Sequence, residues 1–403
     1  MNLKALEAGG SYQLQIIGKE NQISIKDILI GDVWLCSGQS NMQWVVNNVT
    51  NAEVEKKNAN YPQIRTLNIP RRMELSPKDT ISATWLVCSP ETVGHFSGVA
   101  YFFAKKVYEE TNVPIGIINS SWGGTIVETW TSLEAANTLP QKRLDRYNKN
   151  EKLFPPTEYL TRKNKEAKRN DYPSLVYNAM IHPLLSFSIK GVLWYQGENN
   201  VGNAEPYTDW LTCMIGDWRN RWNSELPFYI IQLPNFDSIN KKPLWAEMRD
   251  AQSKVLAVPG THLIVTSDLG DPYDLHPRNK QRVGMRAALQ ALHYEYGYSD
   301  IVSESPMFER MEINGDKVII TFKNTGSGLE IRSRYGCLQG FAIAGEDKKF
   351  HWALGEFKDN RIVIWNPKVP NPVAVRYNWE NNPDGNLYNK DGLPACLFRT
   401  DNW

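Results

Sequence analysis

Short apolar runs and longer helical patterns alternate along the chain between about residues 29 and 295. The apolar runs are 33–36, 115–118, 192–195, 227–233 and 262–267, and the helical patterns lie around 99–110, 207–222 and 282–294. Because a strand–helix–strand connection places successive strands parallel in one sheet, this order predicts a parallel sheet with helices on both faces. The sequence therefore predicts a three-layer α/β/α domain, which we place at residues 29–300.

Strand patterns without helices flank this domain on both sides. Residues 1–28 contain two alternating runs around a polar turn, which predicts a β-hairpin. In the tail, Asn314 and Gly315 separate two apolar runs, a strong hairpin signal. Further short strands are expected at 338–344, 361–365 and 374–379. We therefore expect a β-rich appendage over 301–403 that packs back on the α/β domain and pairs with the N-terminal hairpin.

The composition excludes several classes of protein. The 403 residues carry 45 basic and 44 acidic side chains, which gives no electrostatic footprint for nucleic acid or anionic membrane. No apolar run approaches the roughly 18–20 residues of a membrane span, and the start MNLKALEAGGSYQLQ lacks the apolar core of a signal peptide. The five cysteines form no CxxC pair, and no zinc or calcium ligand pattern is present.

Four of the apolar runs end in clusters of small and polar residues. These clusters are GQSNM at 38–42, NSSWGGT at 119–125, WYQGENN at 194–200 and DLGDPYDLHP at 268–277. Open parallel sheets bind ligands at the carboxyl ends of their strands, so the four clusters are expected to converge on one site. A serine, a glycine pair, an amide and a histidine follow one another there in chain order.

The first cluster contains a candidate nucleophile. Ser40 follows a strand and is expected to begin a helix, whose N-terminal N–H groups favour a developing oxyanion. The segment is not the GxSxG elbow of α/β-hydrolases, because Met42 stands at the second glycine position. An ordinary strand-to-helix turn also accounts for this pattern, so the case for Ser40 as a nucleophile depends on the other clusters.

The other clusters contain the remaining groups that a serine hydrolase needs. Gly123 and Gly124 allow backbone N–H groups to approach a ligand oxygen, although a tight turn has the same signature. The third cluster offers a carboxamide, Gln196, that can donate to an oxyanion. His276 follows Asp274 by two positions, which suits a general base whose tautomer is held by a carboxylate.

Taken together, these motifs resemble the sialate O-acetylesterase family of the SGNH hydrolase superfamily. The segments that carry the resemblance lie within residues 27–403 and are GDVWLCSGQSNMQW, INSSWGGTIVETW, VLWYQGENN, WAEMRDAQ, DLHPRNKQRVGMR and NLYNKDGLPACLFRTDNW. The resemblance implies an SGNH-like fold and a serine esterase that needs neither metal nor cofactor. Such an enzyme removes O-acetyl groups from carbohydrate, above all from O-acetylated sialic acids, through an acetyl-enzyme intermediate.

The resemblance also assigns a role to each candidate residue. Ser40 is implied as the nucleophile, His276 as its base and Asp274 as the orienting acid. The wider superfamily places this acid three residues before the histidine, where the chain has Tyr273. The implied oxyanion donors are the backbone N–H groups of Ser40 and of Gly123 or Gly124, and the side chain of Gln196. The implied supporting residues are Glu198, Asn199 and Arg249.

Two other functions share these features. An acetylxylan-type hemicellulose acetylesterase would use the same catalytic residues. A non-catalytic carbohydrate-binding protein would keep the fold and the many aromatic residues, although binding alone requires neither Ser40 nor His276. Members of the family carry a larger β domain before the GDVW segment, so we expect the hairpin of residues 1–28 to be a remnant of it. The resemblance also implies that the native protein is secreted or periplasmic.

Overall fold

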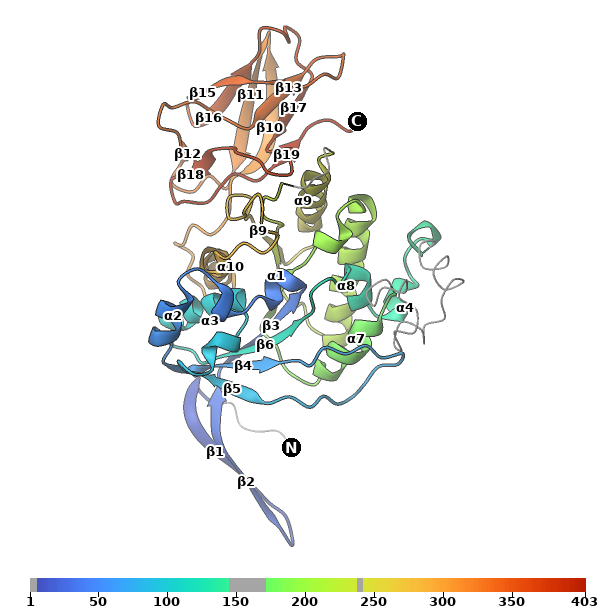
Figure 1. Cartoon of the computed structure of the whole chain (residues 1–403), viewed down its shortest axis with the longest axis vertical. Helices are drawn as coiled ribbons and strands as arrows, with labels where there is room; N and C mark the ends of the chain where they lie inside the picture. The colour runs from blue at the N-terminus through green and yellow to red at the C-terminus, as the bar shows by residue number, and fades with distance from the viewer. Residues whose placement is uncertain (1–5, 145–171, 238–241) are drawn as a thin grey trace.

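The computed structural model describes residues 6–144, 172–237 and 242–403, and its centre is a seven-stranded sheet (Figure 1). The strands are β3 (Asp32–Gly38), β4 (Tyr61–Asn68), β5 (Trp85–Cys88), β6 (Ile115–Ser121), β7 (Gly191–Tyr195), β8 (Phe228–Ile231) and β9 (Thr261–Ile264). Their order is β5-β4-β6-β3-β7-β8-β9, and every neighbouring pair is parallel except β4 with β5. The predicted parallel sheet is confirmed, with one antiparallel strand at its edge.

Helices cover both faces of the sheet. They are α1 (Ser40–Gln43), α2 (Ala52–Asn58), α3 (Gly98–Thr111), α4 (Leu133–Ala136), α7 (Leu175–Met180), α8 (Ala204–Trp222), α9 (Leu244–Lys254) and α10 (Lys280–Glu295). Successive side chains of a strand point to opposite faces. In β3, Trp34 and Cys36 therefore pack in the core shared with α3 and α10, whereas Leu35 packs in the core shared with α7, α8 and α9. The predicted three-layer α/β/α fold is confirmed.

The N-terminal hairpin consists of β1 (Gly9–Ile17) and β2 (Gln22–Ile30). These two strands form a sheet of their own and pair with no other strand that the structure describes. Figure 1 shows the hairpin at one end of the molecule and the C-terminal strands at the other. The expectation that the hairpin pairs with the appendage is therefore wrong, because β2 leads directly into the amino end of β3, far from the tail.

The tail folds into β-structure around a core of its own. One four-stranded sheet contains β10 (Met307–Asn314), β11 (Lys317–Lys323), β15 (Leu354–Lys358) and β16 (Arg361–Trp365). A second contains β13 (Phe341–Ala344), β14 (His351–Trp352), β17 (Ala374–Tyr377) and β19 (Phe398–Arg399), and a two-stranded sheet contains β12 (Leu329–Ile331) and β18 (Leu387–Asn389). The predicted hairpin around Asn314 and Gly315 is present as β10 and β11.

This C-terminal β unit contacts the loops at the carboxyl edge of the central sheet. The Asn235 side chain donates a hydrogen bond to Asn382 Oδ1 at 2.7 Å, and the Tyr388 hydroxyl donates to Asp268 at 3.3 Å. The division of the chain at 28/29 and 300/301 stays a prediction.

Candidate active site

The carboxyl ends of β3, β6 and β7 lie side by side, and three of the four polar clusters follow them. Gly38, at the end of β3, is in register with Ser121 on one side and Tyr195 on the other. The fourth cluster follows β9 and returns to the same edge, where the Leu275 carbonyl accepts a hydrogen bond from Asn41 Nδ2 at 3.1 Å. The structure therefore brings all four clusters together where parallel sheets bind their ligands.

Ser40 begins the short helix α1 immediately after a sharp turn at the end of β3. Gly38 has a φ of +134°, and a Cβ at this position would lie 2.1 Å from the Tyr195 carbonyl oxygen, so the turn requires glycine. The Gln39 N–H donates to the same carbonyl at 2.9 Å. These contacts fix the direction in which the chain presents Ser40, in the first turn of a helix.

The loop after β6 lies directly against Ser40. A Cβ on Gly123 would come within 3.1 Å of Ser40 Cβ, so a glycine permits this close approach. The Gly123 N–H donates to Gln43 Oε1 at 2.8 Å. Asn199 Nδ2 donates to the Gly124 carbonyl at 2.5 Å, which ties this loop to the one after β7. Gly123 thus borders Ser40, the predicted nucleophile, and a substrate oxygen that binds the Gly123 N–H must replace Gln43 Oε1.

Gln196 is fully buried and connects three loops of the site. Its Nε2 donates to Gln39 Oε1 at 3.1 Å, to the Thr125 carbonyl at 3.0 Å and to Asn200 Oδ1 at 2.8 Å. Its Oε1 accepts from the Tyr207 hydroxyl at 3.0 Å. The amide N–H groups are therefore directed to protein oxygens in this structure, and donation from Gln196 to an oxyanion stays a prediction.

His276 lies stacked on Trp44, with ring centroids 4.8 Å apart and ring planes inclined by 8°. Its Nε2 is buried and has no hydrogen-bond partner within the described ranges. Burial lowers the pKa of the imidazole, the Lys280 ammonium lowers it further, and the Asp274 carboxylate opposes both. His276 is therefore neutral near pH 7, the state in which it can accept a proton.

Asp274 holds the main chain of His276. Its Oδ1 accepts a hydrogen bond from the His276 backbone N–H at 2.8 Å, a turn in which an aspartate binds the amide two residues on. In the part of the chain that the structure describes, no hydrogen bond joins this carboxylate to the imidazole ring. Asp274 thus fixes the loop that carries the base, and its role as the acid of a triad stays a prediction.

Glu198 is buried behind the nucleophile turn. Its Oε1 accepts a hydrogen bond from Asn41 Nδ2 at 2.5 Å, and its Oε2 has no hydrogen-bond partner among the described residues. Burial raises the pKa of this carboxyl, whereas the Asn41 hydrogen bond and the Lys280 charge lower it. Glu198 is thus hydrogen-bonded to Asn41, the residue that follows Ser40, and its supporting role stays a prediction.

Arg249 contacts the C-terminal β unit rather than the nucleophile. It is fully buried in α9, and its Nη2 and Nη1 donate to the backbone carbonyls of Glu380 and Asn381. Burial lowers its pKa to about 9. Another side chain of α9, Gln252, reaches the site and donates to the Gln196 carbonyl at 3.0 Å. The WAEMRDAQ helix thus links the site loops to the C-terminal β unit.

Sequence reasoning gave no role to four residues that the structure places at the site. They are Asn41, Gln43, Trp44 and Lys280. Three of them lie in the GQSNMQW segment itself, and Lys280 follows His276 by four positions. The sequence signal that could have identified them is their position within four residues of Ser40 or His276, the predicted nucleophile and base. Their partners lie far away in sequence and could not be identified without the fold.

Two aspartates of the loop after β9 bind other groups of the protein. Asp268 pairs with Arg286 at 2.6 Å, and Asp271 Oδ1 accepts from the Tyr273 N–H at 2.8 Å. Within residues 6–144, 172–237 and 242–403, no three His, Cys, Asp or Glu side chains gather so that they could hold a metal ion. The described residues thus offer no candidate metal centre.

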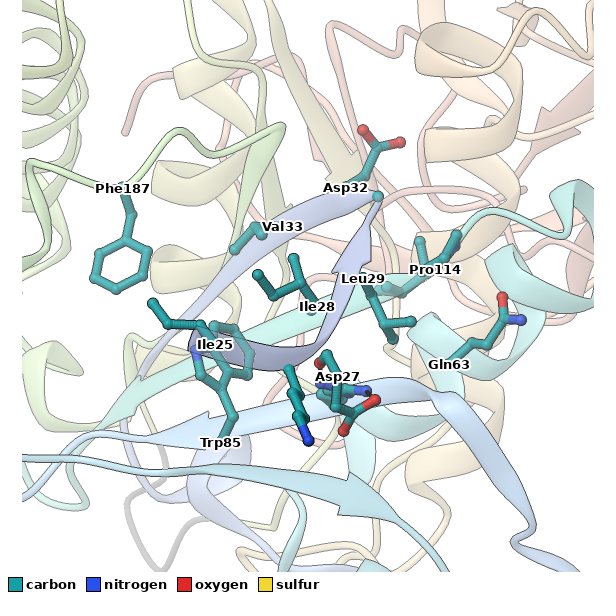
Figure 2. Close-up of a pocket in the computed structure, with 15 residues that line it drawn as sticks. Ile25, Asp27, Ile28, Leu29, Asp32, Val33, Gln63, Trp85, Pro114 and Phe187 are labelled. Carbon is teal, nitrogen blue, oxygen red and sulfur yellow. Dashed lines mark hydrogen bonds and ion pairs between the residues drawn. The ribbon is translucent and has the colours of Figure 1, made fainter. Parts of the chain in front are cut away.

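A mostly apolar cavity of about 370 Å³ lies elsewhere, at the amino ends of the strands. Figure 2 shows Ile25 and Ile28 of the hairpin facing Trp85 and Phe187 around it, with Pro114 at its side. Ligands of parallel sheets bind at the opposite edge. This cavity is therefore separate from the site around Ser40.

Comparisons with known proteins agree with this geometry. A family model described as carbohydrate esterase, sialic acid-specific acetylesterase matches residues 30–293. A solved carbohydrate acetylesterase from Xanthomonas citri is 38% identical with a TM-score of 0.89, and the match covers 100% of this chain and 88% of that one.

Curated relatives are similar over most of this chain. Sialate O-acetylesterase from Homo sapiens is 32% identical over 356 residues, which cover 79% of this chain and 64% of the relative. The Mus musculus protein is 29% identical over 431 residues, covering 94% of this chain and 79% of the relative. The chain thus spans about 64% of the length of the human relative. The resemblance is confirmed, and the chain belongs to the sialic acid-specific acetylesterase family of carbohydrate esterases.

Proposed function

We propose that the protein is a serine esterase that removes O-acetyl groups from carbohydrate, with O-acetylated sialic acids as the leading substrate class. The observation that carries this proposal is the convergence of Ser40, Gly123 and the neutral His276 at the carboxyl edge of the sheet. Family membership supports the substrate class, and the described curated relatives are sialate O-acetylesterases.

In the first half-reaction, Ser40 Oγ attacks the acetyl carbonyl carbon while His276 takes the hydroxyl proton. The carbonyl π electrons move to oxygen and form a tetrahedral oxyanion. We propose that the Ser40 N–H and the Gly123 N–H stabilise this oxyanion, the latter after Gln43 Oε1 releases its hydrogen bond. When the carbon–oxygen bond to the sugar breaks, His276 returns the proton to the sugar oxygen, and acetyl-Ser40 remains.

In the second half-reaction, water replaces the sugar. His276 takes a proton from the water, whose oxygen attacks the acetyl carbon of acetyl-Ser40. The new tetrahedral intermediate collapses, acetate leaves, and the proton returns to Ser40 Oγ. Trp44 holds the imidazole plane and Asp274 holds its backbone during both steps. We propose that Asp274 also stabilises the imidazolium that forms in each step, as the acid of a triad.

Acetylated hemicellulose is the second candidate substrate class. It is supported by the Xanthomonas citri neighbour, a carbohydrate acetylesterase that is 38% identical to this chain, because an acetylxylan-type esterase would use the same catalytic residues. Acetate release from O-acetylated sialic acids and from acetylated xylan, measured by mass spectrometry, separates the two. A carbohydrate-binding protein without activity would release acetate from neither.

The location of the protein stays a prediction. No helix within the described ranges is both long enough and apolar enough to cross a membrane. We propose that the protein acts outside the cytoplasm, as a secreted or periplasmic enzyme, where acetylated glycans are accessible.

A further inference from the structure

A chain of three buried polar side chains lies directly behind Ser40. Lys280 Nζ, at the start of α10, donates to Asn41 Oδ1. Asn41 Nδ2 in turn donates to Glu198 Oε1 at 2.5 Å and to the Leu275 carbonyl at 3.1 Å. Lys280 and Asn41 are fully buried, and Glu198 is nearly so. Buried polar groups are costly unless they are hydrogen-bonded, so each member of this chain depends on the next.

The lysine determines which way the Asn41 amide points. With Lys280 as donor, the amide oxygen must face the ammonium, and the amide nitrogen faces two acceptors, the Glu198 carboxylate and the Leu275 carbonyl. A flipped amide would direct its oxygen at both acceptors and its nitrogen at a cation. The orientation is therefore fixed from both ends.

This amide joins the two halves of the catalytic pair. Asn41 directly follows Ser40 in α1, and Leu275 directly precedes His276 in the loop after β9. Lys280 is also close enough to His276 for its charge to lower the pKa of the imidazole. Neither the family comparison nor the position of the lysine in the sequence gives Lys280 this role.

We propose that Lys280 is a positioning residue of the esterase site: its buried side chain fixes the Asn41 amide, which joins the Ser40 turn to the His276 loop. The inference rests on the proposed function, because it assigns Ser40 and His276 as nucleophile and base. It adds a group that acts through Asn41 and through its charge, without contact with the acetyl ester.

The charge of Lys280 also lowers the pKa of His276, and this effect depends on the groups that surround the lysine. Glu198 approaches from the loop after β7, Asp274 and His276 from the loop after β9, and the Tyr195 ring of β7 lies 5.6 Å from Nζ. From α3, the uncharged Gly98 packs against the lysine side chain, since a Cβ on Gly98 would lie 3.2 Å from Lys280 Cβ. Burial lowers the pKa of Lys280 to about 7, and Glu198 and Asp274 oppose this effect. The lysine is thus charged throughout the more acidic range in which His276 gains its proton.

The decisive variant is Lys280→Met, which keeps an unbranched side chain and removes the charge. We expect kcat for p-nitrophenyl acetate to fall by roughly 10-fold to 100-fold, because a small displacement of Ser40 against His276 is costly. We expect the acidic limb of the kcat/KM profile to move to higher pH by roughly half a unit or more, because imidazolium loses a repelling neighbour. The matched control is Lys105→Met, which removes a half-buried lysine bound to Glu55 at 3.1 Å and should change neither quantity.

A second measurement does not depend on turnover. NMR titration of the His276 imidazole should give a higher pKa in Lys280→Met than in the unmodified protein. If the unmodified protein releases no acetate but this shift occurs, the proposed esterase function fails while the coupling of Lys280 to His276 stands. A folded Lys280→Met protein with unchanged kcat, pH profile and imidazole pKa overturns the proposal.

A further variant tests the proposal if Lys280→Met does not fold. Removing the lysine leaves the Glu198 carboxyl buried without its cation, which can unfold a protein. The double variant Lys280→Met with Glu198→Gln removes both charges together with the lysine hydrogen bond to Asn41, and Glu198→Gln alone is its reference. A double variant with native circular dichroism and kcat roughly 10-fold or more below that of Glu198→Gln supports the proposal, and one with native circular dichroism and the same kcat as Glu198→Gln overturns it.

Discussion

The imidazole of His276 lies flat against the indole of Trp44, with 4.8 Å between the ring centroids and 8° between the ring planes. The stack contacts the ring itself, whereas the Asp274 carboxylate binds the backbone N–H of His276. Trp44, four residues after Ser40, thus provides an aromatic platform that orients the His276 ring.

Replacing Trp44 should allow the His276 ring to turn away from Ser40. We expect Trp44→Ala to lower kcat by roughly 10-fold or more, because the imidazole gains orientations that do not reach Ser40, whereas Trp44→Phe keeps a stacking face and most of the activity. Steady-state kinetics with p-nitrophenyl acetate checks this expectation. Equal kcat values for Trp44→Ala and the unmodified protein would show that the stack has no catalytic importance.

Asp274→Asn tests whether the site contains a triad. We expect kcat to fall by on the order of 10²-fold, because the neutral amide no longer stabilises imidazolium. Asp271→Asn is the matched control, since Asp271 makes the same kind of backbone hydrogen bond in the same loop, to Tyr273 at 2.8 Å. We expect that variant to cost much less, and Asp268→Asn likewise to cost less.

The opposite outcome for Asp274→Asn has a clear structural meaning. An asparagine Oδ1 can still accept the His276 N–H, so the loop would keep its shape. A near-normal kcat would then mean that the carboxylate serves the backbone alone and that Ser40 and His276 act as a dyad.

The close approach of Gly123 to Ser40 predicts a steric effect. In Gly123→Ala the new methyl group would lie 3.1 Å from Ser40 Cβ and 3.3 Å from Gln43 Oε1, so we expect kcat to fall roughly 10-fold or more. Gly216→Ala is the control, because a Cβ there meets nothing within 4 Å and alanine favours the helix α8. Comparison of kcat and melting temperature for both variants checks the prediction. A fully active Gly123→Ala enzyme would show that the close approach of this loop to Ser40 has no catalytic importance.

The environment of His276 predicts the pH dependence of the reaction. Protonated imidazole cannot accept the Ser40 proton, so kcat/KM should fall as the pH drops through the pKa of His276. Burial and Lys280 lower that pKa, so the midpoint of the acidic limb should lie below about 6.5, the ordinary value for histidine. A pH profile of kcat/KM measures the midpoint. A midpoint above 6.5 would contradict the described environment of the base.

The sequence predicted most of the sheet but missed one side of it. The alternating apolar runs identified β3, β6, β7, β8 and β9, whereas β4 and β5 carried no such signal. The β4 segment YPQIRTLN contains a proline and an arginine, and β5 has only four residues. β5 is the edge strand and β4 lies next to it, and in both strands burial is incomplete and the apolar pattern is weak.

The site was predicted as a set of strand ends rather than as a set of contacts. Parallel topology alone brings the clusters around Ser40, Gly123, Gln196 and His276 to one edge. The partners of individual amides depend on packing, as the hydrogen bond from Gly123 to Gln43 across 80 positions shows. Lys280 could not be connected to Asn41, 239 residues earlier, before the placement of α10 was known.

The central claim is that Ser40 is the nucleophile, and its neighbour Ser37 is the natural control. Ser37 is fully buried in β3, and its hydroxyl has no hydrogen-bond partner among the described residues. The most direct measurement is acetate release from an O-acetylated sialic acid by the unmodified protein, Ser40→Ala and Ser37→Ala. We predict release by the unmodified protein, nearly none by a folded Ser40→Ala and substantial release by Ser37→Ala. An active Ser40→Ala enzyme, with or without an inactive Ser37→Ala, would contradict the account.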